Sequence, residues 1–222
     1  MALKYPILIV NLKTYFDSTD DALRIAEIAK KIMRETKTNI VLTPSHLSLR
    51  DIARIVPTFA QSIDPIEIGA HTGHVLAHEV KNLGVLGTLL NHSEKKISHE
   101  EIRKSIEICR KINLISCVCA HSEEDAEKIA GLHPDIILAE PPELIGGDIS
   151  VTTANPDIVK NSVRIVKSIS PETRVLCGAG VKSGDDVRKA IELGADGVGV
   201  ASGIVKARDI EAAMRDIVGG LV

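Results

Sequence analysis

The sequence contains no tryptophan and few aromatic residues of any kind. Aromatic residues make up 2% of its 222 residues, so Ile, Val, Leu and Ala must supply most of the core. A strong charge of either sign is also missing, because the formal net charge is −3. Such a chain has no overall basic field that would favour nucleic acid or an anionic membrane. Any site that binds an anion must therefore be local.

Long apolar runs are missing as well. No stretch approaches the roughly 20 apolar residues that span a bilayer. Residues 1–10 lack the long apolar segment and the cleavage site of a signal peptide. We therefore expect a cytoplasmic protein with no membrane partner.

The four cysteines form no recognisable metal or redox motif. Cys117 and Cys119 are two residues apart, a spacing that fits neither a zinc knuckle nor a redox pair. The same spacing places both on one face of a strand. We expect all four cysteines to be reduced, buried thiols.

The sequence does contain a regular alternation of short apolar runs and amphipathic stretches. Several runs are apolar at consecutive positions, which is typical of parallel strands buried on both faces. The predicted strands are Ile7–Val10, Ile40–Leu42, Thr58–Gln61, Val85–Leu90, Ile115–Cys119, Ile136–Ala139, Arg174–Cys177 and Gly197–Val200.

The stretches between these runs predict helices. Asp20–Glu35 repeats apolar residues along one face, and Ser98 followed by Glu101 is the pattern of a capping box. The remaining helices are predicted near Leu47–Arg54 and Leu76–Asn82, from Ser122 onward, and over Asn155–Ile169, Ser183–Leu193 and Asp209–Val218.

Eight strand–helix units of about 28 residues each are near the lower size limit of a (β/α)8 barrel. A doubly wound open sheet is the alternative, but no Gly-x-Gly-x-x-Gly follows the first strand. The sequence therefore predicts an α/β fold in which residues 1–222 form a single (β/α)8 barrel domain.

Polar residues follow three of the predicted strands, at the end of a barrel where active sites are built. Asn11 and Lys13 follow the first strand and point the same way, and a lysine at the barrel mouth is costly unless it meets an anion. His92 follows the fourth strand, and a short helix opening at Ser93 would keep its imidazole neutral. Glu140 follows the sixth strand, where apolar surroundings suit a general base. Each residue also has an ordinary explanation, as a solvated side chain or a capping histidine.

Glycine-rich turns follow the seventh and eighth strands. They read Gly178-Ala179-Gly180 and Ala201-Ser202-Gly203. Glycines allow close backbone approach, and N–H groups at a helix start can hold a phosphate. This pair of loops is a recurrent phosphate site of such barrels. After the sixth strand, two prolines and then the pair Gly146 and Gly147 predict a lid.

A histidine-rich stretch follows the third strand. His74 and His78 are one helical turn apart, which permits metal binding, and His71 lies close by. No carboxylate or thiol completes an obvious site, so we expect no metal.

Taken together, these residues resemble the triosephosphate isomerase family. The matching pieces occur in the family's order across nearly the whole chain. They are Asn11-Leu12-Lys13, Asn91-His92-Ser93-Glu94, Ala139-Glu140-Pro141, Gly178-Ala179-Gly180 and Ala201-Ser202-Gly203. The short chain and the segment Pro141–Gly146 are similar to the compact archaeal branch.

The resemblance implies an isomerase that interconverts dihydroxyacetone phosphate and D-glyceraldehyde 3-phosphate through an enediolate. The family acts in glycolysis and gluconeogenesis and requires no cofactor. By resemblance, Lys13 anchors the substrate with Asn11 and Leu12 beside it. His92 polarises the carbonyl, and Glu140 moves the proton between two carbons.

The resemblance also implies a phosphate site and an assembly. Ile145, Gly180, Ala201 and Ser202 hold the phosphate, mainly through backbone N–H groups. The loop His71–Gly73 reaches into a neighbouring subunit, which implies a homodimer at least and, for the compact branch, a homotetramer.

Two alternative functions predict different sets of residues. Another phosphate-binding barrel enzyme of small-molecule biosynthesis would share the C-terminal loops but would not need Asn11, Lys13, His92 and Glu140. A non-catalytic barrel that only binds a phosphate ligand would be expected to lose the base or the histidine.

Overall fold

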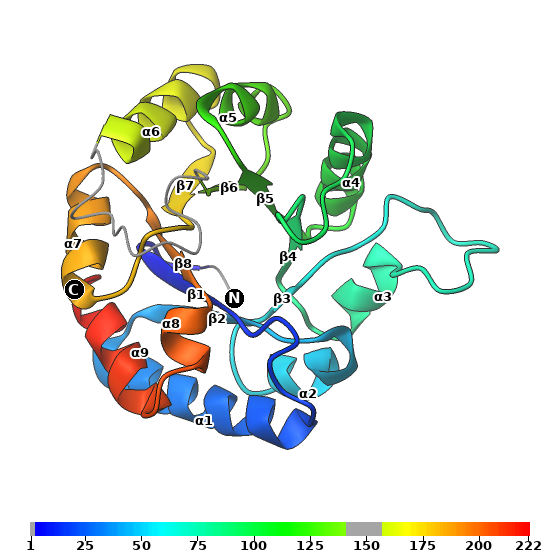
Figure 1. Ribbon diagram of the computed structural model, residues 1–222. Helices are drawn as coiled ribbons and strands as arrows, with labels where there is room; N and C mark the ends of the chain where they lie inside the picture. The colour runs from blue at the N-terminus through cyan, green and yellow to red at the C-terminus, as the bar shows by residue number, and fades with distance from the viewer. Residues whose placement is uncertain (1–2, 141–156) are drawn as a thin grey trace.

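Eight short parallel strands close into a barrel in the computed structural model, which describes residues 3–140 and 157–222 (Figure 1). The strand order is β2-β1-β8-β7-β6-β5-β4-β3. A parallel bridge between Leu42 and Thr58 joins the two ends of that order. The strands are β1 (Ile7–Asn11), β2 (Asn39–Thr43), β3 (Phe59–Ala60), β4 (Gly87–Leu90), β5 (Ile115–Ala120), β6 (Ile136–Ala139), β7 (Arg174–Cys177) and β8 (Gly197–Val200). The predicted barrel is confirmed, and the predicted bounds of β6, β7 and β8 match those observed.

The alternation of side chains along the strands produces two buried layers. Ile7 and Ile9 of β1 point into the barrel, where they pack with Leu138 and other apolar side chains. Leu8 and Val10 point outward and pack against the surrounding helices. Consecutive apolar residues are needed because both faces of each strand are buried. The same alternation turns Asn11 inward at the end of β1.

A ring of helices surrounds the barrel (Figure 1). The helices of the described residues are α1 (Thr19–Thr36), the 3-10 helix η1 (His46–Ser48), α2 (Leu49–Ala53), α3 (Ala77–Asn82), α4 (His99–Lys111), α5 (Glu123–Ala130), α6 (Asp157–Ile169), α7 (Gly184–Glu192), α8 (Ser202–Val205) and α9 (Ile210–Gly219). The capping box expected from Ser98 and Glu101 is confirmed at the start of α4. The four-residue helix α8 was not expected. None of the helices in this part of the chain is long and apolar enough to cross a membrane.

The four cysteines are buried and carry free thiols, as predicted. Cys117 and Cys119 both face the barrel interior, which confirms that they share a strand face.

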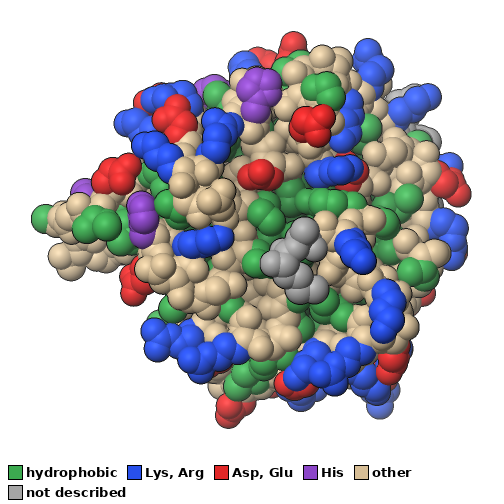
Figure 2. Space-filling view, turned by 180° about the vertical axis from the view of Figure 1, so that it is seen from behind, with side chains coloured by type: hydrophobic (Ala, Val, Ile, Leu, Met, Phe, Trp, Pro, Cys, Tyr) green, Lys and Arg blue, Asp and Glu red, His purple; other side chains and the backbone are tan. Residues whose placement is uncertain are grey.

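The segment between β3 and α3 projects from the ring of helices (Figure 1). It carries Ile68, whose exposed fraction is 76%. Figure 2 shows the molecule from the side opposite to Figure 1, where Asp and Glu side chains are scattered among groups of Lys and Arg around the rim.

Candidate active site

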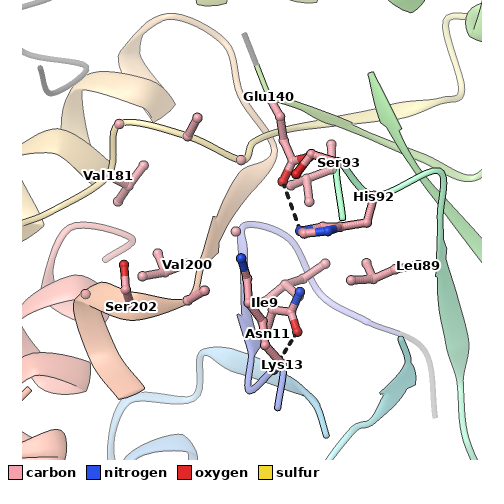
Figure 3. A pocket seen from close by; sticks show the side chains of 17 residues that line it. Ile9, Asn11, Lys13, Leu89, His92, Ser93, Glu140, Val181, Val200 and Ser202 are labelled. Atoms are coloured by element: carbon pink, nitrogen blue, oxygen red, sulfur yellow. Dashed lines mark hydrogen bonds and ion pairs between the residues drawn. The ribbon is translucent and has the colours of Figure 1, made fainter. Parts of the chain in front are cut away.

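A cavity of about 160 Å³ opens at the C-terminal ends of the barrel strands (Figure 3). Its walls come from the ends of β1, β4, β6, β7 and β8 and from the turns that follow them. The lining residues include Asn11, Lys13, His92, Ser93, Glu140, Gly178, Gly180, Val181, Ala201, Ser202 and Gly203. The structure therefore brings together most of the candidate residues of five separate sequence segments.

Lys13 is held at the cavity by its backbone as well as by its charge. Its φ angle is 46°, in the left-handed region that residues with a side chain seldom adopt. Its N–H donates to Asn11 Oδ1 (2.9 Å), and its carbonyl accepts from Gln61 Nε2 (2.8 Å). Its Nζ lies 2.7 Å from Glu94 Oε1, on the turn after β4. Backbone strain of this kind is found where surrounding contacts over-determine a functional position.

The His92 ring is oriented so that one nitrogen faces the cavity. The backbone N–H of Glu94 donates to His92 Nδ1 (3.2 Å), so the neutral ring carries its proton on Nε2. That nitrogen lies 3.8 Å from Glu140 Oε1 (Figure 3). Burial, and then the positive charge of Lys13, lower the pKa of His92. The ring is therefore a neutral N–H donor at neutral pH.

The cause that we expected for the neutral ring was wrong. Ser93 does not open a helix; it lies in a turn in which the N–H of Lys95 donates to the carbonyl of His92 (2.8 Å). The next helix, α4, begins at His99. Burial and the charge of Lys13, rather than a helix N-terminus, lower the pKa of His92.

Glu140 is a buried carboxyl at the end of β6, with an exposed fraction of 7%. Burial raises its pKa to about 7, while the neighbouring Cys119 thiol and the charge of Lys13 act in the opposite direction. Such a group can hold or release a proton near neutral pH, which is the property of a general base.

Glycine at position 178 makes room for Glu140. A Cβ on Gly178 would lie 2.8 Å from Glu140 Cγ and 2.7 Å from Leu138 Cγ. Gly178→Ala is therefore expected to displace the carboxyl and lower kcat about 100-fold, with a smaller effect on KM, since misplacement of about 1 Å can cost this much. Steady-state kinetics check it, with Gly219→Ala as the control, because a Cβ there would meet nothing within 4 Å. Equal effects of the two substitutions would contradict the prediction.

The raised pKa of Glu140 predicts a pH-dependent gain in stability for Glu140→Gln. The ordinary value is 4.5 and the folded value about 7, so the folded state keeps a proton that the unfolded state releases. Stability of the parent protein therefore falls as pH rises between these values and is constant above them. The shift is about 2.5 pKa units and one unit corresponds to about 1.4 kcal/mol, so we expect a gain of about 3 kcal/mol above pH 7 and little gain near pH 4. Urea unfolding at both pH values measures the difference; the same gain at both would contradict it.

Not all of the remaining candidate residues lie at the cavity. Gly180, Ala201 and Ser202 line the cavity, and Ser202 lies on the side opposite His92 (Figure 3). Leu12 does not line it, because alternation along β1 turns its side chain outward into the layer beneath the helices. Ile145 and the predicted lid lie outside the described residues.

Three polar residues close to these candidates were missed by the sequence reasoning. Gln61, Cys119 and His121 each stand at or just past a strand end, and each bonds to the site residues or their neighbours. The signal for His121 is its position directly after β5, at the end of the barrel where active sites form.

Two rings of the histidine-rich stretch, those of His71 and His74, are in contact. His74 Nδ1 pairs with Asp64 Oδ2 (3.3 Å), and His71 meets His74 edge to face. Within residues 3–140 and 157–222, no group of three or more His, Cys, Asp or Glu could hold a metal ion.

Fold and site together define a (β/α)8-barrel enzyme with a carboxyl group and an imidazole facing one cavity at the barrel mouth. The sequence pattern of the triosephosphate isomerase family matches residues 6–218. A triosephosphate isomerase of Methanothermus fervidus is 43% identical over 216 residues, covering 96% of this chain and 97% of its own. Those of Methanocaldococcus jannaschii (44%; 96% and 98% covered) and Methanopyrus kandleri (43%; 99% of both) are similarly close. The chain belongs to the triosephosphate isomerase family, a family of isomerases.

Proposed function

We propose that this enzyme performs its family's reaction, the interconversion of dihydroxyacetone phosphate and D-glyceraldehyde 3-phosphate, with Glu140 as the base. Glu140 removes a proton from the carbon next to the substrate carbonyl and returns it to the neighbouring carbon, while the hydroxyl proton moves to the former carbonyl oxygen by way of His92 Nε2. Between the two steps the substrate is an enediolate, whose negative charge must be stabilised. No net oxidation occurs, and the carboxyl ends in the state in which it began.

His92 and Lys13 act where that charge develops. His92 Nε2–H faces the cavity and can donate to the carbonyl oxygen as it becomes an alkoxide. The Lys13 ammonium, only 22% exposed at its side chain, adds a positive charge that solvent screens weakly. Asn11 supports it by holding the left-handed turn of Lys13.

The substrate phosphate binds at the glycine-rich side of the cavity. Gly180 has a φ angle of 72°, so glycine permits a turn there that brings the backbone close to a ligand. Ser202 begins α8 directly after Ala201, and the first N–H groups of a helix have no partner within it. Backbone N–H groups from two loops then face one dianion.

The observation that supports this proposal most strongly is that His92 Nε2 and Glu140 Oε1 lie 3.8 Å apart across the same cavity as the two glycine-rich turns. The test is a coupled assay of purified protein with each triose phosphate, together with uptake of deuterium from D₂O into product. Interconversion with deuterium uptake is expected. A folded protein that converts neither compound would refute the proposal.

We further propose that the enzyme acts in glycolysis and gluconeogenesis in the cytoplasm, as a homo-oligomer. Membership of this family supports the metabolic role and the oligomer. The projecting segment with exposed Ile68 supports contact between copies, either in a dimer or in a tetramer. Light scattering during size-exclusion chromatography distinguishes these assemblies from a monomer.

A further inference from the structure

A second imidazole lies on the side of Glu140 opposite His92. Glu140 Oε1 faces His92, whereas Oε2 faces His121 Nδ1 at 3.9 Å. His121 is the first residue after β5, and its side chain is 13% exposed, as is that of His92. The family's reaction requires one base and one electrophile, so this histidine has no role in the mechanism derived above.

The other ring nitrogen of His121 already has a hydrogen-bond partner. Nε2 lies 2.8 Å from the carbonyl oxygen of Asn91, which can only accept, so Nε2 carries a proton. In the neutral ring, Nδ1 then presents a lone pair. Asn91 is itself fixed, because its side chain donates to the carbonyl of Cys119 and accepts from the N–H of Ile97. The ring is therefore held in place from β4 and β5.

The two facing atoms are both buried and both lack a hydrogen-bond partner. Among the described residues, His121 Nδ1 and Glu140 Oε2 are two of five buried side-chain atoms in this condition. A buried polar atom without a partner is costly. A single proton placed between these two acceptors would satisfy both, and at 3.9 Å it would draw them together.

We propose that His121 is a positioning residue that shares one proton with Glu140 in the resting enzyme, and that this proton must leave before Glu140 can act as base. This proposal rests on the proposed function of Glu140. The proton sits between Oε2 and Nδ1, so Oε1 stays directed at the cavity and at His92. His121 does not touch the substrate; it sets how firmly the base holds a proton.

The other groups around this pair act on it in known directions. Lys13, after β1, and the Cys119 thiol, on β5, lower the Glu140 pKa, while Glu94, after β4, raises it. Asp125, on α5, accepts from the backbone N–H of His121 (2.9 Å). Burial outweighs them all and keeps the pKa of Glu140 near 7, in the range where a shared proton is held in the resting state.

The variant that isolates Nδ1 is His121→Gln, because a glutamine amide can still donate to the Asn91 carbonyl but offers nothing at the Nδ1 position. Without the His121 Nδ1 acceptor, the protonated form of the Glu140 carboxyl is less stable relative to the carboxylate. The acid limb of the pH profile of kcat/KM is therefore expected to move to lower pH by about 0.5–1 unit, the worth of one hydrogen bond. KM at pH 8 should change less than twofold. His121→Ala, which removes the whole ring, should move the limb the same way.

His133→Gln is the matched control, because His133 pairs with Ser170 far from the cavity. The acid limb of the pH profile of kcat/KM should not move in this variant. An acid limb of His121→Gln that matches the parent, or a uniform loss of activity at every pH, would overturn the proposal and leave His121 a purely structural residue. Thermal unfolding of each variant establishes that it is folded. Failure of the proposed function looks different, since Glu140→Ala would then retain full activity.

Discussion

Glu140→Asp is expected to lower kcat by about 100- to 10,000-fold while changing KM far less. The aspartate carboxyl is withdrawn by one methylene, so it loses alignment with the carbon whose proton it takes. A positioned general base contributes about this factor, and the loss falls mainly on the transition state. Steady-state kinetics in both directions measure the effect.

Two comparisons make the Glu140 result specific. Glu172→Asp alters an exposed carboxylate near the start of β7, at the other end of the barrel, and should leave kcat unchanged. Glu140→Ala should be less active than Glu140→Asp, and full activity of that variant would remove Glu140 from the mechanism. Binding of 2-phosphoglycolate, which mimics the enediolate, shows whether the cavity remains formed.

Lys13→Met is expected to lower kcat/KM by about 100- to 1,000-fold. Methionine keeps most of the side-chain volume but removes the charge beside the developing enediolate, and one such electrostatic contact is worth about this much. Because the lysine also attracts the substrate before reaction, both kcat and KM should worsen. Affinity for 2-phosphoglycolate should fall as well, which isothermal titration calorimetry measures.

The control for Lys13 is Lys95→Met on the same side of the molecule. Lys95 is 55% exposed and bonds to Ser62 Oγ (3.1 Å), so its loss should change kcat/KM less than twofold. Glu94 loses its partner in Lys13→Met but is 61% exposed, so the fold should survive. Equal kinetics for the two lysine variants would exclude Lys13 as the anchor.

Much of the barrel could be predicted from local signals. Strands buried on both faces carry consecutive apolar residues, and Ile136–Ala139 is such a run with the observed bounds. Helix starts follow side-chain chemistry close in sequence, as Ser98 and Glu101 show. Because active sites of this fold form at strand ends, position and residue type also predicted that Lys13, His92 and Glu140 lie together, and all three line one cavity.

Other features depend on contacts between distant residues and could not be predicted in the same way. The ion pair of Lys13 with Glu94 joins residues 81 positions apart. Ser93 begins a turn rather than a helix, although its residue type suits either. Leu12 lies in the family motif between two cavity residues, yet its side chain points into the outer layer.

The sequence by itself determined the barrel, the order of the strand-end motifs and the family, because periodicity and residue type are written along the chain. Only the tertiary structure decided the chemical state of the site. Burial raises the pKa of Glu140 and lowers that of His92, and burial exists only once all eight strands have closed around the cavity. The tertiary structure alone also decided that His121 Nδ1 faces Glu140. The distance between Nδ1 and Glu140 Oε2 depends on where β5 and β6 end side by side.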